Sequence, residues 1–117
     1  MNRVVHFEIN VANPSAIAAF YQRAFGWEFQ QFGEHEYWLA KTGPDNKEGI
    51  NGAIMPTEDG QPRTINTIEV PDIDHALAMV VEAGGIIDVE RHEIPDVGWQ
   101  AYCKDPGGNV FGLHQPF

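Results

Sequence analysis

Apolar and polar residues alternate at the start of the chain, as they do in a strand with one buried face. In VVHFEINV, residues 4–11, apolar side chains fall on one face and His6, Glu8 and Asn10 on the other. The next stretch, NPSAIAAFYQRAFG, begins with an asparagine suited to a helix N-cap and a proline suited to the first helical turn. Apolar residues then recur at helical spacing before a closing glycine. These patterns predict a strand followed by a helix near residues 14–25.

The same order of elements begins again later in the chain. Three short strands in WEFQQF, EYWLAKTG and GINGAIMP follow the first helix, and TINTIEV then reads as a new first strand. A shift of 59 residues places the cap Asn13 on Asp72 and the closing Gly26 on Gly85. A second helix is therefore expected near residues 73–83. Three further strands are expected in IIDVERHEI, GWQAYCKD and NVFGLHQ.

The repeat predicts an α+β fold made of two βαβββ modules. We expect one domain over residues 1–117, with modules at 1–57 and 64–117 joined near EDGQPR. One helix and four strands are too few to bury both faces of a sheet. Two such sheets side by side would curl into open half-barrels that form a trough, which is a natural site for a small molecule.

Charge and composition exclude several classes of partner. The chain has a net charge of -10 and no run of Lys and Arg, which argues against nucleic acid binding. No apolar run approaches the ~20 residues that span a bilayer, and MNRVVHFEIN lacks the apolar core of a signal peptide. Cys103 is the single cysteine, so no intrachain disulfide or multi-cysteine metal cage forms. We therefore expect a cytoplasmic protein with no membrane partner.

Two stretches carry a resemblance to a known family. HFEINV followed by FYQRAFGW, and DPGGNVFGL near the end, resemble the vicinal oxygen chelate superfamily of glyoxalases, bleomycin-resistance proteins and extradiol dioxygenases. The chain looks like a small, single-chain, glyoxalase-like member. The resemblance implies paired βαβββ modules that are commonly dimeric. In metal-dependent members, the first and last strands of each module each supply one ligand, and the ligands meet in the trough.

The four positions that the resemblance marks as metal ligands are poor in donors here. His6 matches the first position, but its counterpart in the second module is Ile65. The last strands bring Gly52, or Asn51 if the register shifts by one, and Gly112. One donor in four does not hold a divalent ion, so we expect no metal at this site and no cofactor. The two glycines would widen the trough floor, or alternatively mark β-bulges or sheet coiling.

Polar residues on the faces of the ligand positions, together with Gly112 and the aromatic Trp99, are the candidate ligand contacts. The residues that we expect to line the trough are His6, Glu8, Asn10, Thr67, Glu69, Trp99, Gly112 and His114. A carboxylate near an imidazole suits general acid–base chemistry, although the same groups also serve as structural hydrogen-bond partners. Trp99 would stack on a planar ligand, with a place in the core or a dimer interface as the alternative. A shifted metal site made of His6, Glu8 and His114 also stays open.

The missing ligands favour one function over two others. The favoured hypothesis is a metal-free trough that binds an unidentified small organic molecule, as drug-sequestering members of the resembled family do. The alternatives are a metal-dependent lyase, isomerase or dioxygenase, and a metal-free acid–base enzyme. Whether a reaction is catalysed stays open. The negative charge disfavours anionic ligands unless local basic groups intervene. The resemblance and the many aromatic residues predict a homodimer.

Overall fold

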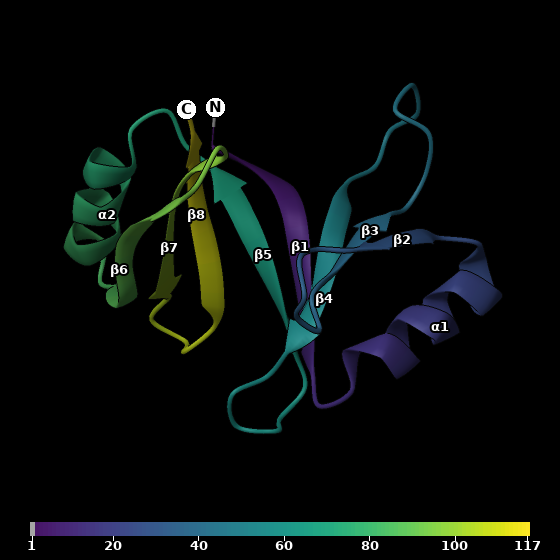
Figure 1. The fold of residues 1–117 in the computed structure, drawn as a ribbon. Helices are drawn as coiled ribbons and strands as arrows, with labels where there is room; N and C mark the ends of the chain where they lie inside the picture. The colour runs from purple at the N-terminus through teal and green to yellow at the C-terminus, as the bar shows by residue number, and fades with distance from the viewer. Residues whose placement is uncertain (1) are drawn as a thin grey trace. The chain divides into compact units, whose positions relative to one another are not determined.

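The computed structural model describes residues 2–117, which divide into two compact units. One unit comprises residues 6–65, and the other comprises residues 66–117 with the N-terminal residues up to Val5. Each contains a helix and a mixed sheet (Figure 1). The predicted fold of two βαβββ modules is confirmed. Within residues 2–117, no helix is long and apolar enough to cross a membrane.

The first module follows the predicted order of elements. Its elements are β1 (Arg3–Val11), α1 (Pro14–Phe25), β2 (Glu28–Gln31), β3 (Trp38–Lys41) and β4 (Asn51–Pro56). Strand β1 pairs with β4 in parallel, β3 pairs with β4 antiparallel, and β2 pairs with β3 antiparallel. The sheet order is therefore β2-β3-β4-β1, and β2 forms an edge.

Helix α1 begins and ends where the sequence predicts. Pro14 occupies the first turn, and Gly26 closes the helix in the left-handed region at φ 75°, with its N–H donating to the carbonyl of Gln22. Asn13 stands at the N-cap position, but its side chain makes no capping hydrogen bond. It accepts one from the hydroxyl of Ser15 instead. Asn13 therefore stands at the predicted N-cap position, although its side chain does not cap the helix.

The second module repeats the order. Its elements are β5 (Arg63–Glu69), α2 (Ile73–Glu82), β6 (Ile86–Ile94), β7 (Gly98–Lys104) and β8 (Val110–Pro116). Strand β5 pairs with β8 in parallel, and β7 pairs antiparallel with both β8 and β6. Here the helix is capped as expected, because the Asp72 carboxylate accepts a hydrogen bond from the His75 N–H at 3.1 Å.

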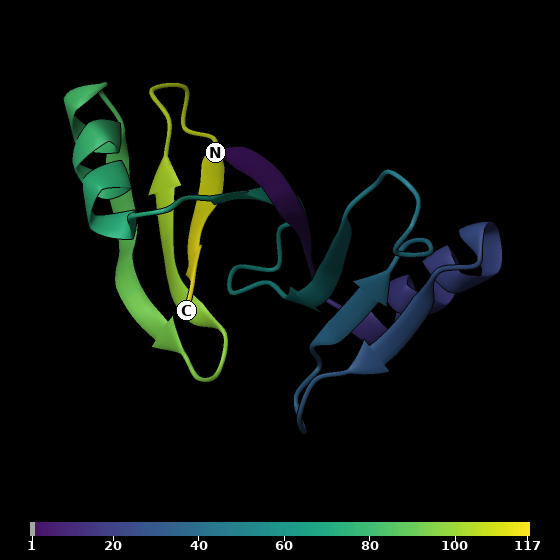
Figure 2. The ribbon, with the colours of Figure 1, turned by 90° about the horizontal axis from the view of Figure 1, so that it is seen from above.

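The core of the second module lies between α2 and its sheet. Figure 2 shows α2 running beside β6 and β7. The fully packed residues are Val70, Ile73, Leu77, Ala101, Cys103 and Leu113. Burial raises the pKa of the Cys103 thiol, and the charges of Glu90 and Asp88 raise it further. Cys103 is therefore a core residue of β7, as expected of an ordinary strand cysteine.

The turn before β8 is organised by one carboxylate. Asp105 accepts hydrogen bonds from the Gly107 N–H at 2.9 Å and the Asn109 N–H at 3.0 Å, and also from the side-chain amide of Asn109. These bonds, led by that of the Asn109 side chain, hold the pKa of the Asp105 carboxyl below its usual range. The DPGGN motif is thus a self-contained turn that starts the last strand.

Candidate functional site

The two faces of the first module's sheet are defined by the register of β1 and β4. His6 pairs with Asn51, and Phe7 pairs with Gly52. Because paired residues share a face and neighbours along a strand alternate, His6 and Asn51 lie on one face and Phe7 and Gly52 on the other. The ring of Phe7 contacts that of Trp27 at 5.8 Å between centroids. The Phe7 face is therefore apolar, and the His6 face carries the polar side chains of β1.

Gly52 does not stand in the ligand position, and that prediction is wrong. A Cβ at Gly52 would lie 2.5 Å from both the Cδ2 atom and the carbonyl oxygen of Phe7. The missing side chain therefore lets the Phe7 ring lie against β4. Asn51, the alternative register, is the residue across from His6.

Gly112 lies on the expected face, but its neighbours close over it. Thr67 pairs with Gly112, and a Cβ there would lie 3.1 Å from Thr67 Oγ1 and 3.2 Å from Gln100 Nε2. The ring of Tyr102 is 3.5 Å from the same point. Thr67 is only 3% exposed. The predicted widening of a floor at Gly112 is therefore wrong, since Thr67, Gln100 and Tyr102 occupy that space.

The other predicted residues of the second module fall on two faces. Glu69 pairs with His114, which places both on the face of Gly112. Trp99 lies on the opposite face, because its neighbour Gln100 is the residue that pairs with His114. Trp99 packs against the core beside α2. The guanidinium of Arg91 lies 4.5 Å from the centroid of the Trp99 ring. Trp99 is thus a packing residue here and does not line the predicted face.

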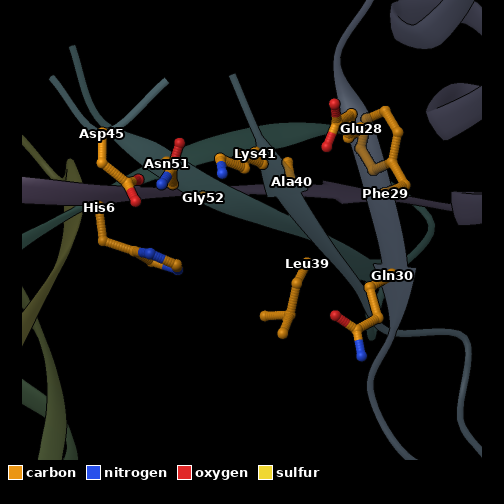
Figure 3. A pocket seen from close by; sticks show the side chains of 10 residues that line it. All are labelled: His6, Glu28, Phe29, Gln30, Leu39, Ala40, Lys41, Asp45, Asn51 and Gly52. Atoms are coloured by element: carbon orange, nitrogen blue, oxygen red, sulfur yellow. The ribbon is translucent and has the colours of Figure 1, made fainter. Parts of the chain in front are cut away.

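A pocket of about 460 Å³ lies entirely within the first module (Figure 3). Its lining residues come from four strands and one loop: His6, Glu28, Phe29, Gln30, Leu39, Ala40, Lys41, Asp45, Asn51 and Gly52. The register explains this grouping, since Glu28 pairs with Lys41, and Gln30 with Leu39. Of the residues predicted as ligand contacts, His6 alone is in the lining. The contributions of β2 and β3 were not predicted.

Glu8 and Asn10 lie on the face of His6 but outside the pocket lining. Glu8 is only 4% exposed. Burial raises the pKa of Tyr37 to about 12, and the charge of Glu8 contributes to that rise. The Nδ2 atom of Asn10 is buried and has no hydrogen-bond partner within the described chain. The side chains of Glu8 and Asn10 therefore lie on the same sheet face as the pocket, next to its lining.

The amide of Asn51 is held in one orientation by Thr42. Its Oδ1 atom accepts a hydrogen bond from the Thr42 N–H at 3.0 Å. The Thr42 hydroxyl in turn donates to the Ile50 carbonyl at 2.6 Å. Because this oxygen already accepts a hydrogen bond from Thr42, the NH₂ group is the part of the Asn51 side chain that is available to a ligand in the pocket.

The residues present do not fit the metal site of the resembled family. The first module offers His6 and Asn51 at the ligand positions, and the oxygen of Asn51 is already bonded to Thr42. The second offers Ile65 and Gly112, which have no side-chain donor. In the part of the chain that the structure describes, no group of three or more His, Cys, Asp and Glu side chains could hold an ion. Three or more donors are the usual requirement.

Comparison with known proteins identifies the family. The sequence profile of the glyoxalase-like domain matches residues 6–114. A search of curated protein sequences finds no significant match. Among solved structures, a glyoxalase/bleomycin resistance protein/dioxygenase superfamily member from Vibrio splendidus 12B01 is 17% identical with a TM-score of 0.70, covering 98% of this chain and 99% of that one.

Two epimerase structures are also similar. Methylmalonyl-CoA epimerase from Mycobacterium tuberculosis is 15% identical with a TM-score of 0.67, covering 97% of this chain and 87% of that one. The Streptomyces coelicolor methylmalonyl-CoA epimerase in complex with 2-nitronate-propionyl-CoA is 14% identical with a TM-score of 0.70, covering 99% and 98%. At these identities the likeness shows the fold alone. The profile match covers most of the sequence, and the chain belongs to the family of glyoxalase-like domains.

Proposed function

We propose that this chain binds a small organic molecule in the pocket of its first module, without a resident metal ion. The observation that carries the proposal is the pocket itself, which opens on the sheet face of His6 and Asn51. Its volume of about 460 Å³ lies in the usual range for small-molecule sites. Leu39 supplies an apolar wall, while Lys41, Glu28 and Asn51 supply polar groups that could orient a ligand.

A metal-free acid–base enzyme is the second candidate. The observation that favours it is the carboxylate of Glu8, buried on the face of His6 and close enough to Tyr37 to raise its pKa. A tyrosine with a pKa of about 12 keeps its proton at neutral pH and can donate a hydrogen bond to an oxygen that gains charge. The epimerase activity of the structural neighbours is not carried over, because the likeness covers the fold only.

Chemical-shift mapping tests the binding function. We expect small organic fragments to shift the backbone amides of residues 28–30, 39–41 and 51–52. Leu39→Trp should block the pocket and remove these shifts. The matched control is Val89→Trp, an exposed aliphatic position on β6 of the other module. Shifts confined to other residues, or unchanged affinity in Leu39→Trp, would contradict the proposal.

Metal content tests the second half of the proposal. The protein is dialysed against a weak chelator, and nickel, zinc, iron and manganese are then added in turn. We expect none to be retained at one ion per chain. Stoichiometric retention of any of them, abolished by His6→Ala, would favour the metal-dependent enzyme instead.

We expect the protein to act in the cytoplasm, since a single cysteine suits a reducing compartment.

A further inference from the structure

Charges of both signs line the pocket without pairing with one another. Lys41 supplies the ammonium group, and Glu28 and Asp45 supply carboxylates. Among residues 2–117, none of these three makes an ion pair within 4.0 Å. Glu28 and Lys41 are cross-strand neighbours on β2 and β3, so the strands hold the opposite charges near each other on the pocket wall. Both signs are therefore available to a ligand.

The fixed amide of Asn51 adds a directed donor to the pocket. Because its oxygen is bonded to Thr42, its NH₂ group has the two hydrogens to offer. Lys41, on the strand next to β4, also has donors only. Together these groups suit a ligand oxygen that carries negative charge, such as a carboxylate. The two acids suit a ligand ammonium group.

We propose that the pocket selects a zwitterionic molecule, with a carboxylate toward Lys41 and Asn51 and an ammonium group toward Glu28 or Asp45. This inference rests on the proposed binding function and names the class of ligand. A simple anion would meet two carboxylates for one ammonium group, in a chain whose net charge is -10. A simple cation would bring no acceptor for Lys41 and the Asn51 amide, which are exposed and would keep water as their partner. A zwitterion satisfies both sets.

Three compounds that share an indole skeleton test the ligand carboxylate and the ligand ammonium group separately. L-tryptophan carries both groups at pH 7, tryptamine lacks the carboxylate and indole-3-propionate lacks the ammonium group. Affinities are measured by the chemical shifts of the pocket amides during titration. We expect L-tryptophan to bind about fivefold more tightly than either analogue, which is the scale of one partly solvated charge pair. The advantage should shrink as salt is raised.

Substitutions assign each charge to a residue. Lys41→Gln should remove the advantage of L-tryptophan over tryptamine without weakening tryptamine. Lys47→Gln, which lies outside the pocket lining, is the matched control and should change neither. Glu28→Gln combined with Asp45→Asn should remove the advantage over indole-3-propionate. Retained dispersion of the amide spectrum shows that each variant is folded.

The outcomes separate this inference from the proposed function. Equal affinity for the three compounds, or tighter binding of either single-charge analogue, overturns the zwitterion. The same holds if Lys41→Gln weakens all three equally. If none of the three binds while uncharged fragments still shift the pocket amides, the ligand class is wrong and the binding function stands. If no compound of any charge shifts these amides, the binding function itself fails.

Discussion

A methyl group added at Gly52 would fall on the ring and backbone of Phe7. The added carbon would be 2.5 Å from the Phe7 carbonyl oxygen, 2.5 Å from Cδ2 and 2.6 Å from Cε2. The ring could turn away, but the carbonyl oxygen belongs to β1, whose pairing with β4 would have to open. We expect Gly52→Ala to destabilise the fold by about 3 kcal/mol, toward the upper end of the usual cost of overpacking.

Gly112→Ala is the matched comparison, because it adds the same carbon to the last strand of the other module. Its closest neighbours would be at 3.1 Å and 3.2 Å, and they are the ends of the Thr67 and Gln100 side chains. A small shift of these side chains relieves the contact. Alanine also recovers roughly 0.5–1 kcal/mol relative to glycine in a strand. We expect the free energy of unfolding to change by less than about 1 kcal/mol.

Urea unfolding followed by tryptophan fluorescence measures both variants. A loss of about 3 kcal/mol is a large part of the 5–15 kcal/mol that typical domains have. It should lower the melting temperature of a chain of this size by about 10 °C. A Gly52→Ala variant as stable as the parent, or a Gly112→Ala variant less stable than Gly52→Ala, would contradict this prediction. The first result would mean that β1 and β4 pair in another register than the one described, and the second would mean that Thr67 and Gln100 cannot shift away from the added carbon.

Two further predictions concern pH and assembly. The pKa of Tyr37 is about 12 in the folded protein against an ordinary 10.0, so its contribution is present below pH 10 and lost between pH 10 and 12. Between pH 9 and pH 11.5, ionisation of Tyr37 should lower the free energy of unfolding of the parent by about 1–2 kcal/mol, discounted for partial exposure. Tyr37→Phe should not show this loss when its unfolding is measured at the same two pH values. We also expect a homodimer with apolar contacts through Phe20 and Phe25 of α1, which are 56% and 66% exposed. Light scattering should give two chain masses at tens of micromolar protein and one for Phe25→Ser, with Val81→Ser on α2 as the control; one chain mass for the parent contradicts it.

Local patterns predicted the elements well because their signals are local. Helix α1 begins at Pro14 and ends before Gly26, and α2 begins after the Asp72 cap, all within a few residues of each pattern. The side chain of Asn13 accepts a hydrogen bond from the Ser15 hydroxyl and makes none to the backbone of α1. Such competition between short polar side chains is not visible in the order of residues alone.

Register was the part that local patterns could not decide. Residues 42–50 form an irregular loop between β3 and β4, and a difference of one residue in that loop exchanges the faces of Asn51 and Gly52. Trp99 was singled out only because it follows the turn before β7, and its pairing with Gln115 puts it on the face opposite to His114. The pocket walls from β2 and β3 were missed because only strand pairing brings Glu28 to Lys41. The sequence of apolar and polar residues in β2 or β3 alone does not indicate this pairing.

The shared face of His6 and Asn51 also bears on how this chain could evolve. An asparagine codon becomes a histidine or aspartate codon by a single nucleotide change, and either residue would set a second metal donor beside His6. A new side chain at Gly52 would meet Phe7 on the other face before it reached any ion. A second metal donor beside His6 would therefore come from residue 51 and not from residue 52. Substitutions at Gly52 would not supply that donor, because a side chain there meets Phe7.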